Sequence, residues 1–191
     1  MFVYRVIAYD PAAKAGNSGS PTYVYPRQTS GRWDNFPEYM TIYVSSSAEA
    51  AIGETFGRHP EWGDSMLDVR FTPGARYALA RYSMNDDTPI VTLDDAATLL
   101  SRGMRPTQVV IRNVPYTQSV ALNIFRERAA SGERRWAGIS WWSFWKPIWP
   151  VTAVWFEKHE DFPLALVDVE PLHLAHPAML EAAKSLVRVI V

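Results

Sequence analysis

The sequence predicts an α+β fold in which a mixed, mainly antiparallel sheet is flanked by helices. Runs of β-branched and aromatic residues, typical of strands, occur at 2–7, 41–44, 77–82, 151–156 and 164–169. Helical patterns separate only some of these runs, so the regular alternation of a doubly wound parallel sheet is absent. A chain of 191 residues fits one domain, and we expect residues 1–191 to form it.

The first half of the chain predicts a strand, a long loop and a strand that leads into a helix. Phe2–Ile7 is the first strand, and residues 10–31, where Gly, Ser, Pro and Asn gather, form the loop. After the strand Thr41–Val44, Ser46 and Glu49 have the spacing of a capping box. They predict a helix over about 47–57.

The remaining elements follow from shorter patterns. Two strands, Met66–Phe71 and Tyr77–Tyr82, are separated by a turn at Pro73-Gly74, and Thr92 and Asp95 open a helix that Gly103 ends. The later elements are a strand at 108–112, a helix at 116–130, strands at 151–156 and 164–169, and a last helix that starts at His176-Pro177.

Composition excludes several classes of protein. The chain is 48% hydrophobic and 20% charged, which is typical of a globular domain, and it has no cysteine for a disulfide or a thiolate site. Its net charge is −1, and the basic cluster at 126–135 is diluted by glutamates, so a nuclease that binds nucleic acid directly is disfavoured.

Targeting and membrane signals are weak. Residues 1–10 contain Arg5 and Asp10 and do not resemble a secretory signal, so we expect a cytoplasmic protein. The apolar stretch 139–156 contains Lys146, Pro147 and Pro150, which disfavour a membrane span. We expect no membrane association.

The common motifs of phosphate loops, dinucleotide-binding turns, zinc proteases and serine hydrolases are absent. The four histidines, His59, His159, His173 and His176, have no metal-site spacing. We therefore expect neither a metal nor a bound cofactor.

Tryptophans gather near the end of the chain. Six of the eight lie within twenty residues, at positions 136, 141, 142, 145, 149 and 155. They can form an aromatic wall for a planar ligand, or they can fill a core beneath the loop that Pro147 and Pro150 impose.

Three polar side chains have both functional and ordinary interpretations. Arg32, between Gly31 and Trp33, suits a phosphate contact, but an arginine taken alone is more often an ordinary surface residue. Tyr43 faces either a cleft or a second layer, because Ile42 and Val44 point the other way. Glu54 lies away from the apolar helix stripe, where a carboxylate is often simply solvated.

Taken together, Gly31-Arg32-Trp33, Tyr43, the Ala-rich helix bearing Glu54 and the segment 138–143 with Ser140 resemble the RES-domain family. The resemblance runs from about Tyr4 to about Val169. Asp34 stands where this family often has Asn, and Ser143 competes with Ser140 as the matching serine. The resemblance implies an ADP-ribosyltransferase-like fold and an enzyme that degrades NAD by breaking the nicotinamide–ribose bond.

The resemblance also implies roles for individual residues. Arg32 would bind the diphosphate, Tyr43 the nicotinamide riboside and Glu54 the ribose, while Ser140 would position the substrate or the acceptor. We also expect Trp33 and Trp141 to contact the substrate. Loss of nicotinamide leaves a cationic ribosyl centre, which a carboxylate stabilises.

Several alternatives stay open. The acceptor is water (an NAD glycohydrolase), inorganic phosphate as co-substrate (an NAD phosphorylase) or a protein side chain (an ADP-ribosyltransferase), and a non-catalytic nucleotide-binding or interaction module is a further hypothesis. The resemblance implies a toxin of a toxin–antitoxin module with a helix-turn-helix antitoxin as partner. Apolar residues of the last helix, such as Leu180 and Val187, offer a surface for a homodimer or a partner, or they pack on the domain.

Overall fold

The computed structural model describes residues 1–70, 72, 74–111 and 113–191. Its elements are β1 (Phe2–Tyr9), β2 (Met40–Ser45), α1 (Ala48–Phe56), β3 (Glu61–Trp62), the 3₁₀ turn η1 (Asp64–Leu67), β4 (Arg76–Ser83), β5 (Ile90–Thr92), α2 (Ala96–Ser101), α3 (Pro106–Val110), α4 (Val114–Phe125), β6 (Gly138–Trp142), β7 (Pro150–Phe156), β8 (Ala165–Pro171), α5 (Pro177–Leu186) and β9 (Val189–Ile190).

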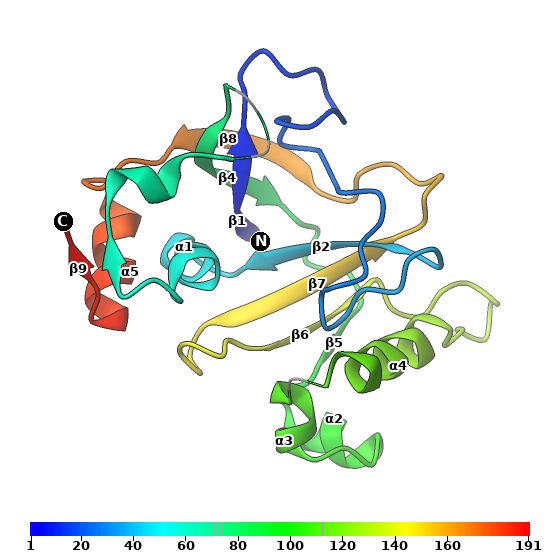
Figure 1. The fold of residues 1–191 in the computed structure, drawn as a ribbon. Coiled ribbons are helices and arrows are strands. Elements are labelled where there is room, and N and C mark those ends of the chain that lie inside the picture. Colours follow the sequence, from blue (N-terminus) through cyan, green and yellow to red (C-terminus); the bar gives the residue numbers. More distant parts are fainter. Residues whose placement is uncertain (71, 73, 112) are drawn as a thin grey trace.

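A seven-stranded mixed sheet in the order β5-β6-β7-β2-β1-β4-β8 forms the centre of the fold (Figure 1). Only β5 and β6 are parallel, and every other neighbouring pair is antiparallel. β3 and β9 form a separate parallel pair. The predicted α+β class with a mainly antiparallel sheet is therefore confirmed.

The sheet opens between β1 and β2. β1 pairs with β4 along its whole length, and β2 pairs with β7 along its whole length. Between β1 and β2 the register contains a single pair, Tyr4 opposite Ser45. The two halves of the sheet therefore diverge on one side of this pair.

Each half of the sheet has its own helices on the same face. α2, α3 and α4 lie beside the β5–β6–β7 half, whereas α1 and α5 cover β1 and β4 (Figure 1). Tyr43 packs against the first core and Tyr4 against the second. Because Tyr4 lies opposite Ser45, two residues from Tyr43, both tyrosines are on this face.

The other face of the sheet carries a third core, beneath the long loop that joins β1 to β2. Ile42, Val44 and Tyr82 are buried there, and Val24 of the loop packs against them. The hydroxyl of Tyr82 donates to the carbonyl of Pro21 at 2.7 Å, which fixes the loop over the sheet. The loop thus has a covering role on this face before its end reaches the opposite face at Gly31.

α1 follows β2 after two residues and is held by the C-terminal elements. The side chain of Ser47, one residue later than predicted, caps the helix by accepting from the Ala50 amide at 3.3 Å. Ile52 and Phe56 are buried against Met179 of α5. After α5, the Arg188 guanidinium donates to the carbonyl of Gly57 at 2.8 and 3.1 Å.

Two predicted strands are wrong where the structure describes them. The region 66–71 begins with the last two residues of η1, where the Met66 amide donates a hydrogen bond to the Gly63 carbonyl at 3.1 Å. Phe71 and Pro73, of the predicted strand and turn, lie outside the described residues. The region 108–112 contains the end of α3, where the Gln108 side chain accepts from the Arg105 amide; Arg112 lies outside the described residues. Such short apolar runs do not distinguish strand from helix.

The other differences concern boundaries and four strands that were not predicted. α4 begins at Val114 because Asn113 caps it, and it ends at Phe125, before the predicted limit. β3, β5, β6 and β9 were missed. The predicted last helix is confirmed, and it packs on α1 rather than standing free, although Leu180 remains exposed.

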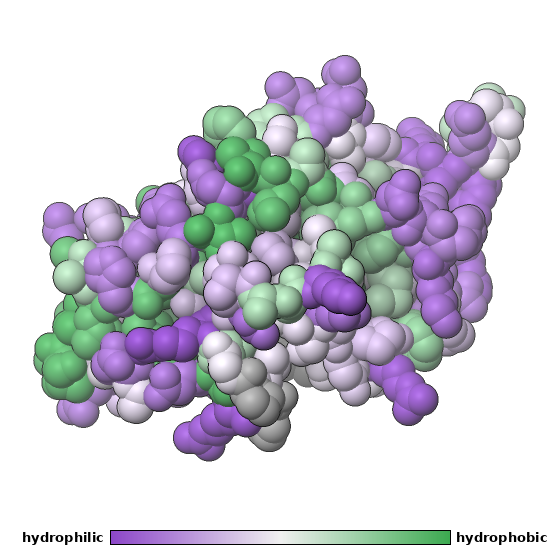
Figure 2. Space-filling view, turned by 90° about the horizontal axis from the view of Figure 1, so that it is seen from above, coloured by the Kyte–Doolittle hydropathy of each residue, from purple (hydrophilic) through white to green (hydrophobic). Residues whose placement is uncertain are grey.

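Large apolar side chains are exposed at several places on the surface. β8, at the top of Figure 1, is an edge strand that exposes Leu166 and Val167. From that side, Figure 2 shows separate apolar areas among hydrophilic ones. In the described parts of the chain, no helix has the length and apolarity needed to cross a bilayer.

Ile52→Ala is expected to lower the free energy of unfolding by about 2–5 kcal/mol, because Ile52 is fully buried between α1 and α5. Leu100→Ala is the matched control. Leu100 is also a helical residue but is 82% exposed, so its change is expected to stay within about 0.5 kcal/mol. Urea denaturation measures both, and an equal loss in the two variants would contradict the core assigned to α1.

Candidate active site

A cavity of about 310 Å³ lies where β1 and β2 diverge. Its walls come from six parts of the chain: β1, β2, the end of the long loop, α1, β6 and the start of β7. The residues with polar or aromatic side chains that line it include Arg5, Arg32, Tyr43, Glu54, Thr55 and Trp141. Four residues predicted from separate motifs, Arg32, Tyr43, Glu54 and Trp141, are thus brought together.

The turn at the end of the long loop is held by Asp34. Its carboxylate accepts the amide of Gly31 at 2.7 Å and the hydroxyl of Tyr43 at 2.8 Å. The Tyr43 oxygen in turn accepts the Trp33 amide at 3.1 Å. Asp34, the residue that departs from the family pattern, therefore fastens the loop to β2.

Tyr43 contributes its ring to the cavity rather than a free hydroxyl. The ring meets Trp141 edge-on, with centroids 6.2 Å apart and planes at 85°. Burial, followed by the neighbouring negative charge of Asp34, raises the pKa of Tyr43 well above its ordinary value. The hydroxyl is consequently a neutral donor to Asp34.

Gly31 is required by close packing in this turn. A Cβ atom at this position would lie 2.4 Å from the Tyr43 oxygen and 2.6 Å from a carboxylate oxygen of Asp34. From the other side, the Gln118 amide of α4 donates to the carbonyls of Thr29 and Gly31 at 2.9 and 3.0 Å. Only the smallest residue fits between β2 and α4.

Arg32 is oriented by aromatic rings and by a backbone carbonyl. Its guanidinium carbon lies 5.4 Å from the Trp141 ring centroid and 5.8 Å from that of Trp33, within the range of cation–π contacts. Its Nη1 donates to the Val109 carbonyl at 2.8 Å. These contacts place a fixed positive charge in the wall of the cavity.

Glu54 projects from α1 toward that charge. Ser143, in the loop after β6, donates to its carboxylate through a hydrogen bond. Burial raises the pKa of Glu54 above 4.5, and the Ser143 hydroxyl and the Arg32 charge oppose part of that rise. The site therefore holds one carboxylate close to one guanidinium.

Ser143, and not Ser140, is the serine beside Glu54. The Ser143 oxygen also accepts the Trp145 amide at 3.0 Å, and its own amide donates to the Trp149 carbonyl at 2.8 Å. Ser140 lies in β6, on the face opposite the buried side chains of Ile139 and Trp141, and it does not line the cavity. Of the two serines that the sequence left as alternatives, the structure places Ser143 beside Glu54, because β6 ends at Trp142 and Ser143 follows in the loop.

Trp33 also differs from its expected place. Its side chain is fully buried and packs on Trp141, with centroids 5.4 Å apart, so it supports the wall without forming it. Trp149 and Trp155 are buried, and Trp149 packs closely on Gly53 of α1.

Arg5 is a cavity residue that sequence reasoning missed. Among the described residues its Nη1 is buried without a hydrogen-bond partner, and burial lowers its pKa. Its position inside an apolar strand was the available signal, because a guanidinium in such a place needs a partner or a ligand. The described part of the chain holds no group of three or more metal-binding side chains.

Comparison with known families agrees with this geometry. A family model described as the RES domain matches residues 3–175. The chain belongs to the RES domain family. The predicted family is thereby confirmed, and the match includes every element that lines the cavity, whereas α5 and β9 lie beyond it.

One solved structure supports the fold of this RES domain. It is described as the crystal structure of the M. tuberculosis MbcT-MbcA toxin-antitoxin complex; the matching chain has a TM-score of 0.63 and 17% sequence identity, with coverage of 96% of this chain and 88% of that chain. No curated protein matches the sequence significantly.

Gly31→Ala is expected to destabilise the RES domain by about 1–3 kcal/mol, because the new methyl group forces the Tyr43–Asp34 contact apart. Gly63→Ala is the control, since its Cβ would meet nothing nearer than 3.5 Å. Urea denaturation compares the two variants. Equal stability would show that the turn has room to move.

Glu54 is also expected to make stability depend on pH. Its folded pKa lies above 4.5, so the folded state binds more protons than the unfolded state between the two pKa values. Wild-type stability relative to Glu54→Gln should therefore fall as the pH rises through the folded pKa. Urea titrations of both proteins from acidic to neutral pH test this, and a difference that rises with pH would contradict the raised pKa.

Proposed function

We propose that this RES domain is an enzyme that cleaves the nicotinamide–ribose bond of NAD. The observation that carries the proposal is the Glu54 carboxylate, held by Ser143 in an aromatic-walled cavity beside Arg32. Cleavage leaves a ribosyl centre with positive charge, and a fixed carboxylate stabilises such a centre. Family membership supports the same chemistry.

Other cavity residues supply binding. The rings of Tyr43 and Trp141 offer apolar contact to the planar nicotinamide. Arg32 gives positive charge for the diphosphate. Arg5 alternates with Val3 and Ile7 toward the opposite face, where its guanidinium lies near Tyr82, so we assign it no substrate contact. Glu54 binds the ribose hydroxyls in this arrangement.

The bond changes balance without a metal or a bound cofactor. The C1′–N bond breaks and its electron pair leaves with neutral nicotinamide, while an acceptor oxygen forms the new bond to C1′. Water as acceptor gives ADP-ribose and one proton; phosphate gives ADP-ribose 1″-phosphate; a protein side chain gives a modified protein. Ser143 holds the Glu54 carboxylate in place during this step.

We further propose that the enzyme is the toxin of a toxin–antitoxin module, acting on cytoplasmic NAD and silenced by an antitoxin that covers the cavity. The support is the family and the fold shared with a chain of the MbcT-MbcA toxin-antitoxin complex. The cavity opens between two separately covered halves of the sheet, which leaves its mouth accessible to a protein partner.

Nicotinamide released from NAD, measured by chromatography with and without phosphate, tests the activity. Glu54→Gln should lower the rate by about a hundredfold or more, because the transition-state charge loses its counter-ion. Ser143→Ala should lower it by about tenfold, through loss of one hydrogen bond to a charged group. Ser140→Ala is the matched control, expected to stay within about twofold because Ser140 lies outside the cavity.

The outcomes separate the alternatives. A requirement for phosphate identifies an NAD phosphorylase, and phosphate-independent release identifies a glycohydrolase. Label from NAD in acid-precipitated protein identifies a transferase. Intact NAD with folded wild-type protein in all three assays contradicts the proposed function and favours a non-catalytic binding module.

A further inference from the structure

A second cavity lies beside the first, on the other side of Thr55. It has a volume of about 400 Å³ and is formed by the end of α1, the residues around η1 and the start of β4. Thr55 lines both cavities. The two spaces are therefore neighbours along α1.

The first cavity is small for a whole dinucleotide. Its 310 Å³ is near the lower limit of the roughly 300–1,000 Å³ typical of ligand pockets. A dinucleotide has two nucleotide halves joined by a diphosphate. A ligand whose nicotinamide half contacts Tyr43 and Glu54 thus needs further space for the other half.

The lining of the second cavity favours an anion. Arg58, His59 and Arg70 contribute basic groups, and among the described residues neither arginine has an ion-pair partner. The acidic lining residue, Asp68, contacts Arg76 at 3.5 Å, but Arg76 also pairs with Asp64 at 3.0 Å, so we count the Asp68 charge against one of the two arginines. The charged side chains that line this cavity therefore carry a net positive charge.

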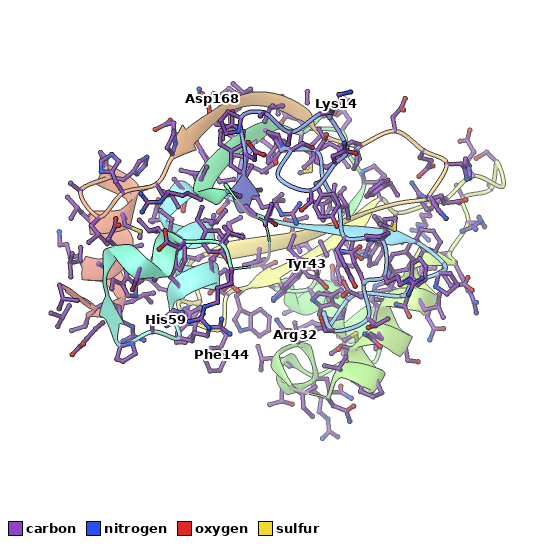
Figure 3. All side chains as sticks on the ribbon, turned by 45° about the horizontal axis from the view of Figure 1, so that its top comes forward. Lys14, Arg32, Tyr43, His59, Phe144 and Asp168 are labelled. Atoms are coloured by element: carbon purple, nitrogen blue, oxygen red, sulfur yellow. The ribbon has the colours of Figure 1, made fainter. Side chains whose placement is uncertain are left out.

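The same cavity also offers an aromatic surface. Tyr77 is half-buried in its wall and meets the ring of Phe56 edge-on, with centroids 5.3 Å apart. Figure 3 shows His59 on the same lower side of the molecule as Arg32, whereas Lys14 lies on the upper side. An aromatic wall beside two arginines suits a base with an attached phosphate.

We propose that this second cavity binds the adenosine monophosphate half of the dinucleotide. Arg58 and Arg70 contact its phosphate, and Tyr77 lies beside the base. The inference rests on the proposed cleavage of NAD and extends it, because it assigns the second half of the substrate to a separate set of residues. Thr55 lies at the junction, where the diphosphate passes from one cavity to the other.

Calorimetric titration with AMP tests this assignment without requiring turnover. Wild-type protein should bind AMP, and Arg58→Ala/Arg70→Ala should weaken that binding by about tenfold or more, because two charged contacts are lost. Glu54→Gln should bind AMP as the wild type does. Lys14→Ala, an exposed cation on the opposite side, is the charge control and should change nothing.

Kinetics give the second measurement. In the double variant, kcat/KM for NAD should fall by about tenfold through KM, while kcat changes by less than about twofold. Thermal unfolding checks that both exposed substitutions leave the fold intact.

The two proposals fail in different ways. Equal AMP affinity in wild type and double variant, or an absence of AMP binding, overturns the second-cavity assignment even when nicotinamide is released. An absence of nicotinamide release overturns the proposed function even when AMP binds through Arg58 and Arg70.

Discussion

The separation of β1 from β2 beyond the Tyr4–Ser45 pair is the constraint on which the candidate site depends. A fully paired sheet would satisfy its backbone groups internally and leave no space between these strands. Here each half of the sheet is stabilised by its other neighbours and by its own helices, so the gap does not weaken the halves. The cavity is thus part of the sheet topology itself.

The charges around this gap are arranged so that each has a defined environment. The Asp34 carboxylate accepts hydrogen bonds from the Gly31 amide and the Tyr43 hydroxyl and holds the loop in place. The Glu54 carboxylate accepts a hydrogen bond from Ser143 and interacts with the positive charge of Arg32, and both favour its ionised form against the effect of burial. Two acids only twenty positions apart in the chain therefore have separate tasks, one structural and one facing the cavity.

Sequence patterns predicted those parts of the fold in which local and long-range preferences agree. Long or alternating apolar patterns mark β1, β2, α1, β4, β7 and β8. Arg32, Tyr43 and Glu54 belong to sequence motifs whose side chains meet in one cavity of the structure. The three-residue strand β5 and the run around η1 carry too little pattern. Arg5 was missed as a cavity residue, and Ser143 was not distinguished from Ser140, because their positions depend on where the sheet opens and where β6 ends, which are tertiary properties.

The C-terminal elements lie beyond the family match, yet they hold the helix that carries Glu54. Arg188 binds the carbonyl of Gly57, Lys146 reaches Ser185 at 3.0 Å, and Met179 packs on α1. The chemistry and the brace of this domain are thereby encoded in different stretches of chain.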